Sequence, residues 1–167
     1  MNDITLIKGD LLTSTADYIC HCVNCQGAFG AGIAGQIRRK YPNVYDVYIN
    51  YIEEIRDRET DSFTSSDLIN QYQIVPINDK QSIVNMFCQL YYGRNKKRYV
   101  SYDAVEIAFR EFFNEIIAKN KKVTVAVPLG FGSGLAGGNQ DIITTIIDTT
   151  LKNCDNNGLI TLEYYYL

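Results

Sequence analysis

The 167-residue sequence lacks any run close to the roughly eighteen apolar residues that a membrane-spanning helix needs. Its first residues also lack the basic region and the apolar stretch of a secretory signal peptide. We therefore expect a cytoplasmic protein with no membrane partner. The formal net charge is -3 and neither half is strongly biased, so duplex DNA and anionic lipid surfaces are poor partners and nucleic acid is not expected to bind.

A metal-binding cluster is missing as well. The chain has a single histidine, and its five cysteines are odd in number and lie mostly within apolar segments. This pattern favours buried thiols in a reducing compartment over a disulfide framework. The segment Cys20-His21-Cys22-Val23-Asn24-Cys25 looks like a ligand cluster, but neighbouring strand residues point to opposite faces and no second ligand pair follows. We therefore expect neither a metal nor a cofactor.

Internal repeats and low-complexity linkers are absent too, and the length fits one domain over residues 1–167. Apolar periodicity predicts strands at 4–7, 17–23, 68–75, 82–89, 123–127 and 160–167, with a polar loop at 60–67. Helices are predicted at 33–41, ended by Pro42, and at 44–55, 102–116 and 142–151. Interleaved strands and helices predict an α/β domain with helices on both faces of a sheet, and the hairpin-like neighbours at 68–89 indicate a mixed sheet.

Glycine is ordinary in amount but not in position. Nine of the 12 glycines fall in two windows, Gly27 to Gly35 and Gly130 to Gly138, and each window lies between a predicted strand and a predicted helix. Glycine lets backbone N–H groups approach an anion closely, and a helix N-terminus adds partial positive charge. Two such loops at the carboxyl ends of strands would hold a diphosphate from both sides without a basic patch. The alternative is that these glycines only form tight turns.

Two familiar phosphate-binding motifs fit less well. Both windows match G-x-G-x-x-G, at residues 30–35 and 132–137, but six residues separate Val23 from the first match. The positions about twenty residues further on, where a dinucleotide-binding motif needs an acidic strand end, lie in a predicted helix. No Gly-Lys-Ser/Thr follows either window, which excludes a Walker A loop.

Together the motifs resemble those of the macrodomain family, whose members bind ADP-ribose. The matching segments occur in the same order along the chain: Lys8-Gly9-Asp10-Leu11, His21-Cys22-Val23-Asn24, Gly27 with Gly30-Ala31-Gly32-Ile33-Ala34, and Gly130 to Gly138. With the closing strand, the resemblance covers essentially the whole chain. It implies a three-layer α/β/α sandwich around a mixed central sheet, and a small-molecule ligand of the ADP-ribose type.

The resemblance also implies binding roles. Asp10 would accept a hydrogen bond from the adenine amino group and Asn24 would face the distal ribose, with a turn cap and an Asx-type turn as the respective alternatives. Phe29 would pack beside the distal ribose, with a place in the core as the alternative. The other implied binding residues lie in or beside the two loops and at the chain end: Leu11, Gly30, Ala31, Gly32, Ile33, Gly132, Ser133, Gly134, Leu135, Ala136, Tyr165 and Leu167. Which tyrosine of residues 164–166 contacts the adenine stays open.

Two catalytic branches of the family differ at a few positions. One removes ADP-ribose from protein carboxylates with a lysine and an aspartate, but those positions hold Gln89 (or a neighbour) and Ala136 here. The other hydrolyses ADP-ribose 1″-phosphate and has a Gly-Leu/Ile-x-Gly loop and a histidine, which match residues 134–137 and His21. A histidine with a pKa near neutrality would orient or deprotonate a water, and Asp141 would orient that water or the histidine. The alternatives are a structural buried histidine and an ordinary first-turn helix residue.

The leading hypothesis is therefore an enzyme that binds ADP-ribose and hydrolyses ADP-ribose 1″-phosphate. A non-catalytic module that binds ADP-ribose or an NAD-derived signal nucleotide, and an ADP-ribosyl glycohydrolase, are the alternatives. The basic loop Arg94 to Arg98 would form either a lid or a solvated face. No feature of the sequence demands more than a monomer.

Overall fold

The computed structural model describes residues 2–58, 68–91, 93 and 97–167. Its strands are β1 (Asp3–Lys8), β2 (Tyr18–Asn24), β3 (Tyr72–Pro76), β4 (Ser82–Gln89), β5 (Val123–Pro128) and β6 (Ile160–Tyr166). Its helices are the short 3-10 helix η1 (Leu11–Thr13) and the α-helices α1 (Gly32–Lys40), α2 (Pro42–Arg58), α3 (Tyr102–Ile117) and α4 (Gln140–Cys154). None of these helices, within the described residues, is long and apolar enough to cross a membrane.

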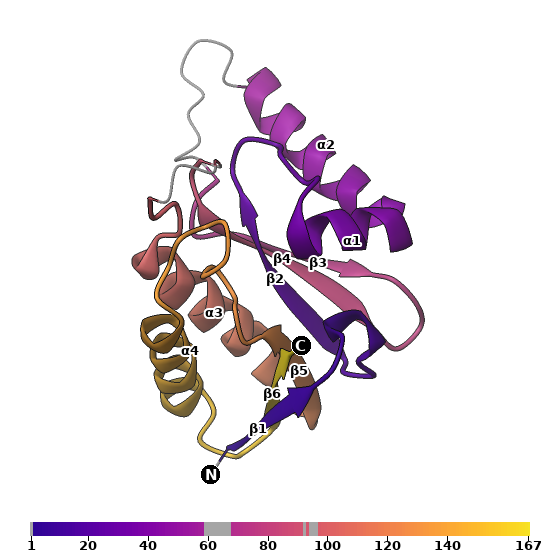
Figure 1. Ribbon diagram of the computed structural model, residues 1–167. Coiled ribbons are helices and arrows are strands. Elements are labelled where there is room, and N and C mark those ends of the chain that lie inside the picture. The colour runs from indigo at the N-terminus through magenta and orange to yellow at the C-terminus, as the bar shows by residue number, and fades with distance from the viewer. Residues whose placement is uncertain (1, 59–67, 92, 94–96) are drawn as a thin grey trace.

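The strands form a six-stranded sheet in the order β1-β6-β5-β2-β4-β3. Every neighbouring pair is parallel except β3 and β4, which are antiparallel. Figure 1 shows α1 and α2 on one side of this sheet and α3 and α4 on the other. The prediction of a three-layer α/β/α sandwich with a mixed sheet is therefore confirmed.

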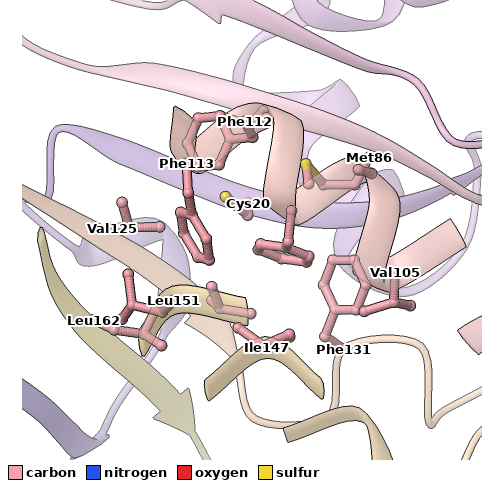
Figure 2. Packing of buried hydrophobic residues seen from close by; sticks show 14 of the residues in the cluster. Cys20, Met86, Val105, Phe112, Phe113, Val125, Phe131, Ile147, Leu151 and Leu162 are labelled. Carbon is pink, nitrogen blue, oxygen red and sulfur yellow. The ribbon is translucent and has the colours of Figure 1, made fainter. Parts of the chain in front are cut away.

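The core on the α3 and α4 side is rich in aromatic and branched side chains. Phe112 and Phe113 of α3 gather there with Ile147 and Leu151 of α4 and with side chains of the sheet (Figure 2). All four are almost completely buried, and burying one such side chain stabilises the fold by about 1.5–3 kcal/mol. This packing holds α4 against the sheet, and with it the second glycine window, which leads into the helix.

Strand β2 is buried on both faces, as predicted. Cys20 packs in the cluster on the α3 and α4 side, whereas Ile19 and Val23 pack in the cluster on the α1 and α2 side. This is the alternation that a pleated strand requires. β4 and β5 pair with β2 on its two edges, so the strand that carries His21 and Asn24 lies in the middle of the molecule.

Two helices, α2 and α4, begin two residues earlier than the apolar pattern predicts. α1 ends at Lys40 and α2 begins at Pro42, because a proline in the first helical turn lacks only an N–H that has no intrahelical partner. α4 begins at Gln140, because the side chain of Asn139 accepts a hydrogen bond from the Ile142 amide at 3.0 Å and so caps the helix.

The strand predicted at residues 68–75 begins later than expected. β3 starts at Tyr72, and residues 68–70 form a turn in which Asn70 has a φ of 76°. Leu68 is buried in the α1 and α2 cluster without joining the sheet, and periodicity alone cannot separate such a residue from a strand residue. The polar loop predicted at 60–67 lies outside the described residues.

Candidate functional site

Two adjoining cavities lie at the carboxyl ends of the parallel strands. The larger, of about 540 Å³, lies between the two glycine windows, which follow β2 and β5. The smaller, of about 280 Å³, is lined by the segment after β1 and by the end of β6. Ile33, Pro128 and Gly130 line both, so the two cavities share a wall. Open α/β sheets bind their ligands at this edge, which makes the pair of cavities the candidate site.

The smaller cavity brings together residues from the two ends of the chain. β1 pairs in parallel with β6, so the residues that follow the two strands meet at the same edge of the sheet. Asp10 and Leu11 therefore line this cavity together with Tyr165 and Leu167. These four residues, all predicted to bind the ligand, therefore line one cavity.

The alternation of side chains along β6 separates its three tyrosines. Tyr164 is buried on the α4 side, where its hydroxyl donates a hydrogen bond to Asp148 at 2.6 Å. Tyr165 and Tyr166 both line the smaller cavity. Tyr164 does not line either cavity, because its ring packs in the core and its hydroxyl is bonded there. Contact of Tyr165 or Tyr166 with an adenine stays a prediction.

Asp10 has one carboxylate oxygen in use and one free. Its Oδ1 accepts a hydrogen bond from the Leu12 amide at 2.9 Å and so caps η1, which is the turn-cap alternative. Its Oδ2 accepts no hydrogen bond from the described residues. A carboxylate offers acceptor sites on both oxygens, so the cap orients the side chain and leaves an acceptor at the cavity.

Asn24 is the centre of a hydrogen-bond network that shapes the first glycine window. Its Oδ1 accepts from the amides of Gln26 and Ala28 at 2.9 and 3.2 Å, and its Nδ2 donates to the Ala28 carbonyl at 2.6 Å. The Asx-type turn is therefore present. An amide nitrogen has two N–H donors and only one is used here by the described residues, so Asn24, which lines the larger cavity, retains a donor for a ligand.

Tyr48 of α2 supports this network, a role that was not predicted from the sequence. Its hydroxyl lies 2.8 Å from the Asn24 carbonyl and 3.0 Å from Asn24 Oδ1, and it accepts from the Gly27 amide at 3.1 Å. Burial raises the pKa of Tyr48 well above its usual value, so the phenol stays protonated and able to donate. The one sign of this role in the sequence is a tyrosine on the apolar face of a helix, because the hydroxyl of a buried tyrosine usually forms a hydrogen bond.

The first glycine window presents unpaired backbone donors beside a helix N-terminus. Gly30, Ala31 and Gly32 line the larger cavity, and their amides donate no hydrogen bond within the described part of the chain. Gly32 begins α1, whose first turn contains no acidic side chain. Gly35 allows α1 to lie close against the loop at Gly30, because a Cβ at residue 35 would lie 2.7 Å from the Gly30 carbonyl oxygen. Free amides and the positive end of a helix together favour an anion.

The second glycine window offers a matching set. Gly134, Leu135 and Ala136 line the larger cavity, and none of their amides donates to another described residue. The Ala136 carbonyl accepts from the amides of Tyr99 and Val100 at 2.7 and 3.0 Å, which fastens the loop to that segment. Gly132 also lines the cavity with a φ of 67°, a conformation that suits glycine. Two groups of free donors therefore border one cavity.

His21 is buried, with 1% of its surface exposed, and it is among the residues that line the larger cavity. Its Nε2 lies 2.6 Å from Asn85 Oδ1, and its ring meets Phe29 edge to face at 5.3 Å between centroids. Burial lowers the pKa of His21 to about 4, against a smaller opposing effect of the Asn85 hydrogen bond. The expectation of a pKa near neutrality is thus wrong, because the imidazole is desolvated and no charged group among the described residues offsets this effect.

Three predicted site residues do not line either cavity. Phe29 is 2% exposed and packs against Tyr48 at 4.8 Å between ring centroids, which is the core alternative. Ser133 turns back on its own loop, where its hydroxyl donates to the Gly130 carbonyl at 2.9 Å. Asp141 is exposed in the first turn of α4, which agrees with the alternative that it is an ordinary acidic residue at a helix N-terminus.

The two positions that distinguish the carboxylate-specific branch both border the larger cavity. Gln89 donates from Nε2 to the Tyr91 carbonyl at 2.8 Å and accepts a weak hydrogen bond from the Cys22 thiol at 3.5 Å. Ala136 offers no side-chain chemistry. Neither position therefore supplies a nucleophile or a general base.

Cationic side chains and metal ligands contribute little to the described site. Of the basic loop, Arg94 to Lys96 lie outside the described residues, while Lys97 and Arg98 lie over the rings of Tyr99 and Tyr102 at 5.3 and 4.2 Å. No group of three or more His, Cys, Asp or Glu residues in the described ranges is arranged to hold a metal ion. Among the residues that the structure describes, backbone amides are therefore the main donors that could bind an anion in the larger cavity.

No family model matches the chain. A curated relative from Debaryomyces hansenii, an ADP-ribose 1″-phosphate phosphatase, is 33% identical over 103 residues, which cover 56% of this chain and 58% of that protein. A relative of the same name from Meyerozyma guilliermondii is 27% identical over 103 residues, covering 58% and 59%. The match therefore spans less than two thirds of the length of either relative.

Solved structures match over nearly the whole chain. A Bacteroides thetaiotaomicron protein of unknown function has a TM-score of 0.79, 26% identity and 99% coverage of both chains. The macrodomain of Mycobacterium tuberculosis DarG has a TM-score of 0.74 and 20% identity, covering 100% of this chain and 99% of that one. Thermosipho africanus DarTG in complex with ADP-ribose has a TM-score of 0.75 and 17% identity, covering 99% of this chain and 42% of that one.

Proposed function

The chain has the macrodomain fold, and from that premise we propose that it binds ADP-ribose or a derivative and hydrolyses ADP-ribose 1″-phosphate. The adenine would occupy the smaller cavity beside Asp10 and Tyr165. The diphosphate and the distal ribose would occupy the larger cavity, between the two glycine windows and next to Asn24.

The two sets of free backbone amides carry the binding proposal. They border one cavity from opposite loops, and one set lies at the N-terminus of α1. A hydrogen bond to a charged group contributes about 1.5–3 kcal/mol. Two or three such bonds to a diphosphate would take the place of a lysine or arginine, which the described lining of the larger cavity does not contain.

The catalytic proposal is supported by the loop at residues 134–137 and by the two relatives named as phosphatases. In the hydrolysis, a water molecule attacks the phosphorus atom and the bond between phosphorus and the anomeric oxygen breaks. The anomeric oxygen then receives a proton that the water has lost. His21, which is uncharged at neutral pH, would accept a hydrogen bond from this water and orient it. Gln89 and Ala136 leave the carboxylate-specific chemistry without its lysine and aspartate.

Binding and chemistry are tested on the same samples by calorimetry and by release of inorganic phosphate. ADP-ribose and its 1″-phosphate should both bind, and only the second should release phosphate. His21→Ala should slow release of phosphate by about 100-fold or more. Asp141→Asn tests the second predicted catalytic residue: slower release supports the prediction, and unchanged release assigns Asp141 to the helix alone.

The role of Asp10 is tested by a substitution that keeps its cap. In Asp10→Asn the side-chain oxygen can still accept from the Leu12 amide, but the free acceptor becomes an NH₂ donor. ADP-ribose affinity should fall about 10-fold or more, since two donors would face each other. Inosine diphosphate ribose, which carries a carbonyl in place of the adenine amino group, should then bind the variant better than it binds the wild type. Equal affinities of both proteins for both ligands would contradict the assignment.

A non-catalytic ADP-ribose-binding module is the second candidate, and one observation favours it. The chain's single histidine has a pKa of about 4, so it is a weak base at neutral pH. Tight binding of ADP-ribose without phosphate release would select this function. A panel of ADP-ribosylated protein and DNA substrates, with release of free ADP-ribose as the readout, tests the glycohydrolase alternative.

A further inference from the structure

A row of hydrogen-bonded polar side chains, two of them buried and one partly buried, crosses three neighbouring strands on the α1 and α2 side of the sheet. His21 of β2 meets Asn85 of β4, with 2.6 Å between Nε2 and Oδ1. Asn85 Nδ2 donates to Gln73 Oε1 of β3 at 3.2 Å, and Gln73 Nε2 donates to the Val47 carbonyl of α2 at 3.4 Å. The sheet register pairs His21 with Asn85 and Asn85 with Gln73. The pairing of the strands therefore aligns the three side chains.

The contact with the Val47 carbonyl, at the α2 end of this row of side chains, determines which atom donates in each of its hydrogen bonds. The Val47 carbonyl can only accept, so Gln73 must turn its NH₂ group toward α2 and its oxygen toward Asn85. Asn85 then donates to Gln73, and its oxygen faces His21. Since Asn85 Oδ1 can only accept, Nε2 of His21 must carry the hydrogen.

The other ring nitrogen of His21 is left as an unpaired acceptor. Nδ1 is buried and has no hydrogen-bond partner among the described residues, although buried polar atoms are almost always paired. The imidazole borders the larger cavity. A hydroxyl group or a water molecule held by a ligand in that cavity is the kind of donor that would complete the site.

No charged group among the described residues contributes to the pKa of His21. The titratable groups packed in the same cluster are the thiol of Cys25 and phenols that include Tyr48. Burial raises the pKa of Cys25 to about 12 and the pKa of Tyr48 still further, so neither is ionised at neutral pH. This environment contrasts with sites in which an aspartate orients the histidine and stabilises an imidazolium.

We infer that Asn85 and Gln73 are positioning residues that hold His21 in the Nε2–H tautomer, so that Nδ1 is a dedicated hydrogen-bond acceptor for a bound ligand. Asn85 and Gln73 act only through the histidine and do not line either cavity. The assignment of the His21 tautomer does not depend on whether the protein is an enzyme. The identity of the donor, a hydroxyl of the ADP-ribose type of ligand or a water beside it, rests on the proposed function.

The chain's single histidine allows a direct test by nitrogen-15 NMR. In the unliganded protein at pH 7, Nε2 should have the shift of a protonated ring nitrogen and Nδ1 that of an unprotonated one. Asn85→Asp should place a carboxylate against Nε2–H and raise the His21 pKa by about 1 to 3. Asn114→Asp, on the exposed face of α3, adds the same charge away from the site and should leave the pKa unchanged.

Gln73→Leu keeps the test valid if the fully buried Asn85 does not tolerate substitution. Gln73 is only partly buried, and its loss should free the Asn85 amide to rotate, so that the two tautomers of His21 become mixed. A wild-type His21 protonated at Nδ1, or a Gln73→Leu variant with an unchanged tautomer, would overturn the inference. Addition of ADP-ribose should move the Nδ1 resonance; absence of ADP-ribose binding by calorimetry would instead overturn the proposed function and leave the tautomer result intact.

Discussion

The burial of His21 predicts a specific dependence of stability on pH. Its pKa is about 4 in the folded chain and 6.5 in the unfolded reference. The folded pKa is depressed, so the unfolded state binds more protons between these values and stability falls as the pH falls. The contribution is fully present above about pH 6.5 and is lost through the window down to about pH 4. At about 1.4 kcal/mol for each pKa unit, the total is roughly 3 kcal/mol, of which about 2 kcal/mol is lost by pH 5.

Urea unfolding at pH values from 5 to 7.5 measures this contribution. His21→Gln is the matched variant, because it removes the titrating group and keeps a side chain that can hydrogen-bond to Asn85. Carboxylates contribute equally to both proteins, so the difference between the two pH profiles isolates the histidine. The wild type should lose about 2 kcal/mol more than the variant between pH 7.5 and pH 5. Parallel profiles would refute the reasoning, since they would mean that His21 is solvated or protonated in the folded state.

Three further predictions concern the loops around the larger cavity. A Cβ at Gly134 meets nothing within 4 Å, so Gly134→Val should unfold at the wild-type temperature. Its ADP-ribose affinity, measured by calorimetry, should fall by about 10-fold or more. The control Thr145→Val, on the exposed face of α4, should keep both the unfolding temperature and the affinity of the wild type. Tyr48→Phe leaves buried partners of the hydroxyl unpaired, so urea unfolding should show a loss of about 1–3 kcal/mol. Gly35→Ala places a Cβ 2.7 Å from the Gly30 carbonyl oxygen and should lower both stability and ADP-ribose affinity; unchanged values would show that the loop adapts freely.

The location of the site could be predicted because it depends on chain order and on one geometric rule. Apolar segments mark the strands, and the glycine windows follow two of them. The carboxyl ends of parallel strands meet at one edge of a sheet, so the windows were expected to border a common crevice. Residues 134–136 and 30–32 do so.

The partners of individual side chains could not be predicted, because they depend on strand pairing that the sequence does not display. Asp141 and Asp10 both follow apolar or glycine-rich segments, yet Asp10 lines a cavity and Asp141 is an exposed first-turn residue. Phe29 lies within a glycine window, but the ring of Tyr48 from α2 draws it into the core. Each outcome depends on a contact with a distant element.

The sequence by itself determined the order of the elements, the two glycine windows and the shortage of positive charge that makes backbone donors necessary. Those properties are local, since they depend on periodicity, on glycine's conformational freedom and on composition. Only the tertiary structure decided that Tyr165 and not Tyr164 borders the smaller cavity, and that His21 is uncharged and held by Asn85. These features depend on which face of a strand turns inward and on which strand lies beside it, and both are settled when the sheet assembles.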